Sequence, residues 1–244
     1  MSAAPDGDRS LIVTPTYNER DNLPQFVDSV FQVVPRAHIL VVDDNSPDGT
    51  GRVASELAAK DERIRVLHRP RKMGLGTAYV EAFEKYLSAD YEYFFEMDTD
   101  MSHDPAYLPD FYEAFRAGAD LVTGSRNIPG GGVEGWGPGR HFISKGGSLY
   151  SRAVLGVPIR DLTTGYKAFS RSALEAIDIG SIHSNGYSFQ IEMTYRALRA
   201  GLKVVEVPIT FVDRRAGQSK MSRKIFLEAV GVVWKLRYHA LRGK

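Results

Sequence analysis

The sequence predicts an α/β fold, with a mostly parallel central sheet flanked by helices on both faces and a helical extension at its C-terminal end. Short apolar runs alternate with helix-like segments through the first half of the chain, and this alternation is typical of parallel strands joined by right-handed crossovers. Polar and glycine-rich segments follow the apolar runs. Ligands of parallel sheets bind at this edge, beyond the carboxyl ends of the strands.

The predicted strands and helices follow from the spacing of apolar residues. The predicted strands are Leu11–Val13, Ile39–Val42, Ile64–Leu67, Tyr93–Met97, Leu121–Thr123 and Val204–Val212. The predicted helices are Glu19–Val34, Gly51–Ala59, Gly74–Leu87, Ala106–Ala117, Phe142–Leu155, Phe189–Ala200 after Ser188 as N-cap, and a last one from about Arg223.

The segment Ile128–Gly139 holds clustered glycines, two prolines and a tryptophan. This composition predicts a loop, and its length indicates a mobile lid that covers a binding site. Neither an internal repeat nor an interdomain linker is evident. We therefore expect one domain over residues 1–220 and a C-terminal amphipathic helix over residues 221–244, associated with a membrane or a partner.

Composition excludes several classes of function. The 244 residues include 31 Lys and Arg against 30 Asp and Glu, and no cysteine. An even balance of charge gives no overall attraction to nucleic acid, and without cysteine there are no disulfides or thiolate metal sites. The polar residues 1–10 do not resemble a signal peptide, and no apolar run approaches the ~20 residues of a membrane span. We expect a cytoplasmic protein, at most peripheral to a membrane.

Two carboxylates end the apolar run Phe94–Met97. If the chain stays extended, Asp98 and Asp100 point to the same side of the strand. Like charges this close favour a cation between them, and Mg2+ or Mn2+ prefers oxygen ligands and leaves positions for phosphates. A solvated acidic turn is the alternative for an isolated Asp-x-Asp.

Three further segments lie at or near predicted strand ends. Pro15–Glu19 offers a fixed turn, an aromatic ring and a carboxylate. Asp43–Thr50 could accept hydrogen bonds from a ribose or a base, although these residue types also form ordinary capped turns. Arg71–Gly76 combines cations and glycines at a helix N-terminus, which suits a phosphate but is also compatible with helix packing.

Cations in or beside predicted loops form another candidate site. They are Arg126, Arg140, Arg214, Arg215 and Lys220. Arginine forks bind phosphate oxygens in pairs, so these residues indicate recognition of phosphates. A solvated basic turn is the alternative.

The motifs occur in an order that resembles a known family. They are Pro-Thr-Tyr-Asn-Glu, Val-Val-Asp-Asp-Asn-Ser-Pro-Asp-Gly-Thr, Met-Asp-Thr-Asp-Met-Ser-His, Gly-Ser-Arg and Arg-x-x-Gly-x-Ser-Lys. Together they resemble the inverting glycosyltransferases of the second family, which have the GT-A fold. The segments Gly131–Trp136, Ile143–Gly146, Asp161–Gly165 and Glu206–Phe211 narrow the resemblance to dolichyl- or polyprenyl-phosphate mannosyltransferases. The match extends from Leu11 to about Lys220.

The resemblance implies transfer of mannose from GDP-mannose to dolichyl or polyprenyl phosphate, and a role for each matching residue. The donor nucleotide would contact Pro15, Tyr17, Glu19, Asp44, Gly74 and Leu75. Asp98 and Asp100 would bind Mg2+ or Mn2+. Some relatives carry Gln in place of Ser102, so Ser102 as a third ligand is open, and its short side chain could act through water. The acceptor phosphate would be held by Arg126, Arg140 and Ser144, and Arg214 and Lys220 would clamp phosphates. The catalytic set is thus Asp98, Asp100, Arg126, Arg140, Arg214 and Lys220.

The implied chemistry works without a dedicated base. A lipid monophosphate has a second pKa of about 6 and is largely anionic at pH 7, so it is itself a nucleophile. The enzyme supplies position and charge neutralisation. Attack opposite the leaving group inverts the anomeric centre and gives a β-linked product. We therefore expect Asp161 to orient the sugar or an arginine rather than to act as an obligatory base.

Several alternatives stay open. The segment after Arg223 is too short to span a membrane, but Trp234, Tyr238 and a basic end suit an interfacial helix; it could equally pack on the protein's own core. A membrane-anchored subunit would serve the same purpose. The donor could be a UDP-sugar, as in glucosyl- or aminoarabinosyl-type enzymes. A non-catalytic nucleotide-binding subunit would have lost the metal and phosphate residues, and a nucleotidyltransferase would need a Gly- and Lys-rich loop after the first strand.

Overall fold

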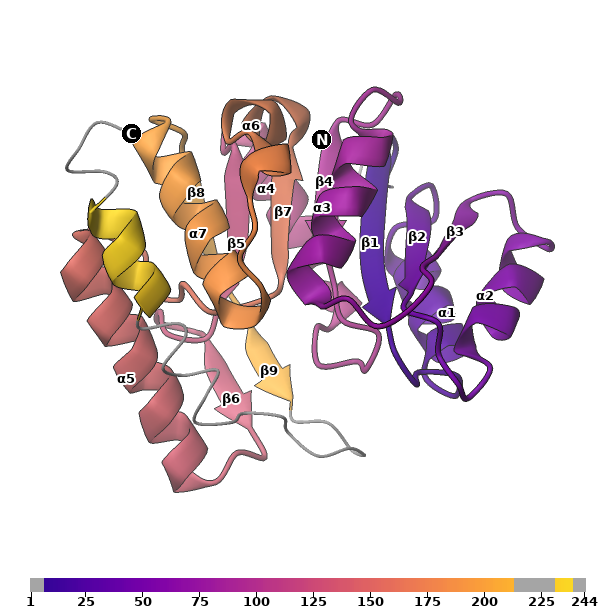
Figure 1. Cartoon of the computed structure of the whole chain (residues 1–244), viewed down its shortest axis with the longest axis horizontal. Helices are drawn as coiled ribbons and strands as arrows, with labels where there is room; N and C mark the ends of the chain where they lie inside the picture. Colours follow the sequence, from indigo (N-terminus) through magenta and orange to yellow (C-terminus); the bar gives the residue numbers. More distant parts are fainter. Residues whose placement is uncertain (1–6, 213–230, 239–244) are drawn as a thin grey trace.

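The computed structural model describes residues 7–212 and 231–238, except for the side chains of residues 138–143. Its centre is a seven-stranded sheet in the order β3-β2-β1-β4-β7-β5-β8 (Figure 1). The strands are β1 Ser10–Thr16, β2 His38–Asp43, β3 Ile64–His68, β4 Tyr93–Glu96, β5 Leu121–Ser125, β7 Lys167–Ser170 and β8 Val204–Pro208. All neighbouring pairs are parallel except those that β7 makes with β4 and β5. The predicted fold class is confirmed.

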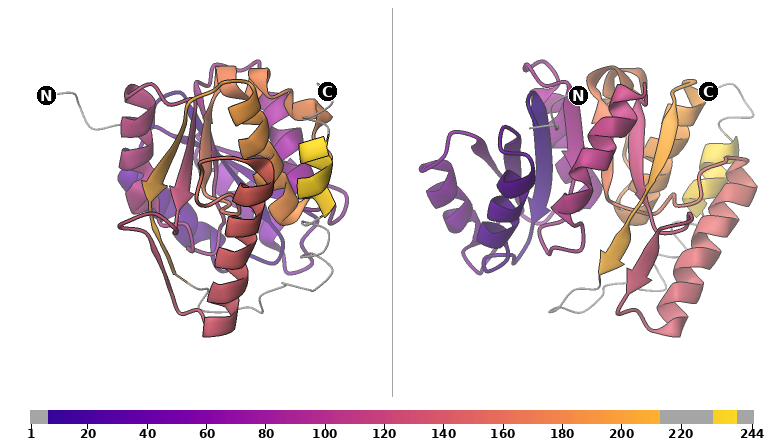
Figure 2. Two further views of the ribbon diagram at one scale, coloured as in Figure 1. Left: turned by 90° about the vertical axis from the view of Figure 1, so that its left-hand side faces the viewer. Right: turned by 180° about the vertical axis from the view of Figure 1, so that it is seen from behind.

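Helices cover both faces of the sheet (Figure 2). On one face lie α1 Leu23–Val33, α2 Thr50–Ala58 and α4 Leu108–Arg116, the last after a 3-10 turn at Pro105–Tyr107. On the other face lie α3 Leu75–Tyr86, α6 Arg171–Ala176 and α7 Gly186–Arg199, with a second 3-10 turn at Ile179–Ser181. The right-hand view of Figure 2 shows α4 in front of the sheet, and Figure 1 shows α3 and α7 on the opposite side.

A smaller unit extends the sheet at its lower edge in Figure 1. Strands β6 Gly132–Glu134 and β9 Thr210–Val212 form a parallel pair, and α5 Pro138–Leu155 follows β6. The segment predicted as a lid therefore includes a paired strand. The helical residues 231–238 pack beside α5 and α7 through the fully buried Val233, so this part of the C-terminal extension contacts the protein's own core.

Several predicted boundaries were wrong. Helix α1 starts at Leu23 rather than Glu19, because Pro24 is compatible only with the first turn of a helix. Helix α7 starts at Gly186, after Asn185 in the extended geometry of an N-cap, and Ser188 is a buried residue within the helix. The strand predicted over Val204–Val212 is divided at Ile209, which donates a hydrogen bond to Ser125 O of β5 and accepts one from Gly132 N, at the start of β6.

Other elements escaped prediction because they are short. Strand β7, helix α6 and strand β6 span only a few residues each, and β7 begins with a lysine where an apolar residue is the usual sign of burial. The boundary expected between residues 220 and 221 lies outside the described residues, as does most of the helix expected from Arg223. Among the described residues, no helix is both long and apolar enough to cross a membrane.

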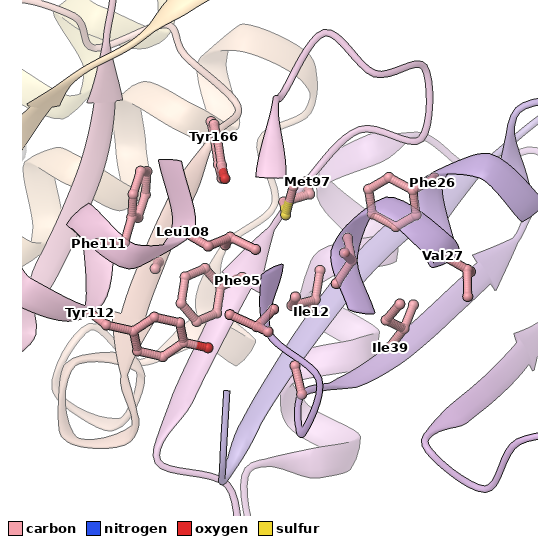
Figure 3. Close-up of a cluster of buried hydrophobic side chains, with 14 of the residues drawn as sticks. Ile12, Phe26, Val27, Ile39, Phe95, Met97, Leu108, Phe111, Tyr112 and Tyr166 are labelled. Carbon is pink, nitrogen blue, oxygen red and sulfur yellow. The ribbon is translucent and has the colours of Figure 1, made fainter. Parts of the chain in front are cut away.

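Aromatic side chains fill the space between β4 and α4 (Figure 3). Phe95 is fully buried, and its ring centroid lies 5.2 Å from that of Tyr112 and 6.1 Å from that of Phe111. Phe111 in turn stacks on Tyr166 at 4.6 Å. This packing holds β4 against α4. Strand β4 is the strand that leads into Asp98.

We expect Phe95→Ala to lower the free energy of unfolding by about 3–5 kcal/mol, because the substitution leaves a cavity among rings that cannot close it. Phe95→Leu keeps most of the volume and should cost less than half as much. Urea unfolding of the three proteins measures both values. Equal costs for Ala and Leu would show that the rings do not pack as described.

Candidate active site

The candidate residues gather along one edge of the sheet because parallel strands end on the same side. The carboxyl ends of β1, β2, β4 and β5 all lie at the lower edge of the sheet in Figure 1. Strand β2 leads into Asp44, β4 into Asp98 and β5 into Arg126. The chain order of strands reverses beside β1, and this is where open α/β sheets bind ligands.

The two carboxylates after β4 do not lie on an extended strand. Regular pairing ends at Glu96, and the chain turns at Thr99–Asp100, with Met101 at a φ of 62°. The expectation that Asp98 and Asp100 lie on one face of an extended strand is therefore wrong, because the chain turns between them. The turn is anchored by the buried hydroxyl of Thr99, which lies 2.7 Å from Thr14 Oγ1 on β1.

His103 holds Asp98 in two ways. Asp98 N donates a hydrogen bond to His103 Nδ1 at 3.0 Å, and His103 Nε2 lies 3.8 Å from Asp98 Oδ2. Because Nδ1 accepts this hydrogen bond, it carries no proton. The ring is buried and stacks on Tyr166 at 5.0 Å, so the position of Asp98 is tied to the core.

The oxygen donors around Asp100 fit a hard divalent cation. Asp100 Oδ1 accepts a hydrogen bond from Ser102 N at 3.1 Å. Ser102 Oγ is buried and has no hydrogen-bond partner among the described residues, which leaves its lone pairs available to a metal ion or a water. No cluster of three or more His, Cys, Asp and Glu side chains within the described ranges could hold a metal alone. Other oxygens, such as substrate phosphates, would have to complete the shell.

A buried charge network lies directly behind the carboxylates. Glu96 of β4 and Lys167 of β7 are register partners and both are fully buried. Gln190 of α7 links them: Lys167 Nζ donates to Gln190 Oε1 at 2.7 Å and to Gln190 O at 2.8 Å, and Gln190 Nε2 donates to Glu96 Oε2 at 2.7 Å.

Burial opposes both charges of this pair. It raises the pKa of Glu96 to about 7, against the opposing effects of the Lys167 charge and the Gln190 hydrogen bond. It also lowers the pKa of Lys167 to about 8, although Glu96 and Asp161 favour the protonated amine. The pair therefore titrates close to neutral pH, unlike most buried ion pairs.

The end of the site where the nucleotide is predicted to bind is built around Asp44. Its carboxylate accepts a hydrogen bond from Met73 N at 3.1 Å and forms an ion pair with Arg69 Nη1 at 2.8 Å. The Arg69 side chain is almost completely buried, so it fixes the loop before α3. The Lys72 ammonium lies 3.9 Å from the centre of the Tyr17 ring, which brings the segments after β1 and β3 together.

The other residues predicted for the nucleotide lie at the same end. Pro15 is within β1 and pairs with Val42 of β2. Glu19 accepts a hydrogen bond from Asn22 Nδ2 at 2.7 Å. Gly74 precedes Leu75, the first residue of α3, and has a φ of 104° that favours glycine. A Cβ at Gly74 would also lie only 2.9 Å from Asn185 Oδ1.

Arg126 marks the other end of the site and is held by Asp161. The guanidinium donates from Nε and Nη2 to the two carboxylate oxygens at 2.7 and 2.8 Å, and from Nη2 to Thr163 Oγ1 at 3.0 Å. Burial works to raise the pKa of Asp161, but the charge and hydrogen bonds of Arg126 outweigh it, and this pKa lies below its usual value. Asp161 therefore orients an arginine, as expected, and stays ionised.

Two aromatic rings lie next to Arg126. The guanidinium carbon lies 5.5 Å from the Trp136 ring and 5.7 Å from the Phe211 ring, and these rings contact each other. Nη1 of Arg126 donates to no acceptor among the described residues, and it is the part of the fork that remains for a ligand. The acceptor-phosphate role predicted for Arg126 stays a prediction.

Not all predicted phosphate residues can be placed. Ser144 is a half-buried residue of α5. Arg140 belongs to the same helix, one turn earlier, but its side chain is outside the described part of the chain, and Arg214 and Lys220 lie outside it altogether. The site therefore brings together Asp98, Asp100 and Ser102 at its centre, the Asp44 group at one end and Arg126 at the other.

Sequence reasoning missed the residues that support this site. They are Glu96, Lys167, Gln190, His103 and Arg69. For Glu96 and Lys167 a signal was present, since each is a charged residue in an otherwise apolar strand and such residues are rarely buried without a partner. Nothing in the sequence indicated the contacts of Gln190 or Arg69, because they depend on the packing of α7 and α3.

Comparison with known proteins identifies the family of the chain. The family described as Glycosyl transferase family 2 matches residues 11–178. The chain is 49% identical to a polyprenol monophosphomannose synthase of Mycolicibacterium smegmatis, over 97% of this chain and 88% of that protein. It is 48% identical to an undecaprenyl-phosphate mannosyltransferase of Micrococcus luteus, over 97% and 98%.

Solved structures show the same fold at lower identity. Glucosyl-3-phosphoglycerate synthase from Mycobacterium tuberculosis, in complex with phosphoglyceric acid, aligns with a TM-score of 0.69 and 19% identity over 96% of this chain and 81% of that one. A complex of the same enzyme with Mn2+, UDP-glucose and phosphoglyceric acid aligns with a TM-score of 0.68 and 20% identity, over 96% and 81%. The agreement establishes the GT-A-like architecture of the chain.

Glu96→Gln should remove a pH dependence of stability. The pKa of Glu96 rises from 4.5 to about 7 on folding, so the folded protein keeps a proton that the unfolded chain has lost. The resulting stabilisation is complete below pH 4.5 and is lost as the pH rises through about 7; it amounts to roughly 3 kcal/mol. Urea unfolding across this range, without divalent ions, measures the difference between the two proteins. If the free energies of unfolding of the two proteins changed with pH in parallel, the raised pKa of Glu96 would be contradicted. Glu113→Gln, which changes an exposed residue, serves as the control.

Asp161→Asn should lower the free energy of unfolding by about 3–5 kcal/mol, because it leaves the Arg126 charge buried without its partner. If the pair acts as a unit, combining this change with Arg126→Met should cost clearly less than the sum of the two single substitutions. A double-mutant cycle by urea unfolding measures the coupling. If the two costs were additive, Arg126 and Asp161 would not be energetically coupled, which would contradict the bidentate pair.

Proposed function

Because the chain belongs to glycosyltransferase family 2, we propose that it transfers mannose from GDP-mannose to the phosphate of a polyprenyl or dolichyl lipid. The observation that carries this proposal is the near-full-length identity of 49% and 48% to two enzymes named for polyprenol and undecaprenyl phosphate mannosylation. The geometry of the site supplies an independent physical argument.

The two ends of the site are separated by one strand. Strand β7 lies between β4, which leads into Asp98, and β5, which leads into Arg126. Neighbouring strands are about 4.8 Å apart, so the two strand ends are separated by about 10 Å. This spacing leaves room for a hexose between donor phosphates near Asp98 and an acceptor phosphate near Arg126.

The donor would lie across the carboxyl ends of β2, β1 and β4. Tyr17 and Asp44 would contact the nucleoside, together with Pro15, Glu19, Gly74 and Leu75. Asp98 and Asp100, with Ser102 behind them, would hold Mg2+ or Mn2+, which fits their oxygen donors. When bound, this ion neutralises charge on the departing nucleoside diphosphate. His103 would keep Asp98 in place while the phosphates bind.

The acceptor phosphate would approach Arg126, whose Nη1 is directed to no acceptor among the described residues. Arg140 and Ser144 of α5, and Arg214 and Lys220, are proposed to complete its binding. Because a lipid phosphate is largely dianionic at pH 7, it attacks the anomeric carbon without a base. Asp161 is committed to Arg126 through both oxygens, which supports a positioning role. Attack from the face opposite the nucleotide inverts the anomeric centre.

The acceptor is a membrane lipid, so the reaction is proposed to run on the cytoplasmic face of a membrane, with the enzyme bound peripherally. The C-terminal residues 221–244 are proposed to contact the lipid surface or a membrane-anchored subunit. Trp234 and Tyr238, which are 58% and 51% exposed, support this role, since such rings favour the interface between lipid and water.

Product formation tests the proposal. The purified protein, supplied with Mg2+ or Mn2+ and a short polyprenyl phosphate, should form mannosyl lipid from GDP-mannose but no product from UDP-glucose or UDP-galactose, as read by mass spectrometry. Asp100→Ala should reduce the rate by about a hundredfold or more, because several kcal/mol of charge stabilisation are lost.

Asp110→Ala removes an exposed carboxylate on α4 and is the matched control, with an expected rate within about twofold of the unchanged protein. If the protein transferred a sugar from a UDP-sugar, the proposed donor would be wrong, but glycosyl transfer to a lipid phosphate would stand. A rate for Asp100→Ala equal to that of the control would contradict the role of Asp100.

A further inference from the structure

A groove of about 720 Å³ crosses the outer surface of α7, away from the carboxylates. Its floor is the part of α7 that includes Glu192, Arg196 and Arg199. One wall is the connection from α6 to α7, with His183, and the other is the helix at residues 231–238, with Lys235. Figure 1 shows this helix beside α7, drawn in yellow.

Cations dominate the groove. Arg196 is neutralised by Glu192, whose Oε1 lies 2.6 Å from Arg196 Nη2. Arg199 and Lys235 have no ion-pair partner in the part of the chain that the structure describes. Arg199 lies in the last turn of α7, where a cation interacts favourably with the helix dipole. Lys235 comes from a different helix, so cations from two separate elements meet at the groove.

Apolar groups surround these cations. Ile177, Val232 and Leu236 line the groove beside the charged groups. On the same helix as Lys235, Trp234 and Tyr238 are more than half exposed, and Leu149 of the neighbouring α5 is 65% exposed. Cations flanked by exposed aromatic and aliphatic side chains are typical of surfaces that lie on a lipid bilayer.

We propose that this groove binds the headgroup phosphate of an anionic phospholipid and thereby docks the enzyme on the membrane. The inference rests on the proposed function, because only a lipid acceptor requires a membrane position. The headgroup phosphate lies between Arg199 and Lys235, with Trp234 and Tyr238 at the level of the headgroups. This site is distinct from that of the reacting lipid phosphate, which is argued to lie near Arg126 at the carboxyl end of β5.

Charge decides between candidate occupants. The sequence beyond Tyr238 carries Arg242 and Lys244 and no acidic residue, so it does not complement a cationic groove. An acidic segment of a partner protein would complement the charge but would not account for the exposed Trp234 and Tyr238 on the helix that carries Lys235. An anionic lipid satisfies both features, because a surface of acidic lipids attracts each basic residue near it.

Vesicle binding by the full chain tests the proposal, without substrates. The unchanged protein should sediment with vesicles of phosphatidylcholine and phosphatidylglycerol and only weakly with phosphatidylcholine alone. Arg199→Gln combined with Lys235→Gln should weaken binding to the anionic vesicles about tenfold or more. Arg199→Lys combined with Lys235→Arg keeps the charge and should retain binding within about threefold.

Lys60→Gln combined with Arg116→Gln is the matched control, since it removes the same charge from α4 and from the turn after α2, on the opposite face of the sheet. An equal loss in the control and the groove variant would show non-specific attraction and overturn the proposal. So would unchanged binding of the groove variant, or equal binding to both kinds of vesicle.

Mannosyl transfer to a short acceptor in detergent separates this proposal from the proposed function. None of the groove or control variants should change that rate by more than about twofold, because none of these residues is part of the active site. Vesicle binding lost together with an unchanged detergent rate supports the groove. Loss of the detergent rate in the groove variant would assign these residues to the reaction instead. An inactive unchanged protein would contradict the proposed function but not the vesicle result.

Discussion

The insertion of β7 between β4 and β5 is the constraint on which the rest of the structure depends. This antiparallel strand sets the distance between the carboxylates after β4 and the arginine after β5. It also carries Lys167, whose ammonium is held by Gln190 and lies near Glu96 on one side and Asp161 on the other. The strand therefore connects the two halves of the site both by hydrogen bonding and by charge.

Burying these charges is unfavourable unless each has a partner. Lys167 faces Glu96, and Arg126 faces Asp161, so each basic side chain has an acidic partner. The hydrogen bonds that link Lys167 to Glu96 through Gln190 are directional, and a shift of β7 along β4 would break them. We infer that the pair of Glu96 and Lys167 fixes the register of β7 more than it adds to stability, because burying an apolar pair of the same volume would cost less free energy.

A second group of contacts joins the site to the small β6–β9 unit. Trp136 and Phe211 cover the guanidinium of Arg126, and Phe211 also contacts His103, which holds Asp98. The aromatic rings thus connect the segment after β6 to both ends of the site. A change in the position of this unit would be transmitted to Arg126 and, through His103, to the carboxylates.

The sequence by itself determined the fold class, the strand ends that form the site, and the presence of Asp44, Asp98, Asp100 and Arg126 there. It could do so because alternating apolar runs and parallel strands place every carboxyl end at one edge. Only the tertiary structure decided that the chain turns after Asp98, that β7 enters the sheet in the opposite direction, and that Lys167, Gln190 and His103 support the site. These features depend on contacts between residues far apart in the chain, and local patterns of apolar residues carry no information about such contacts.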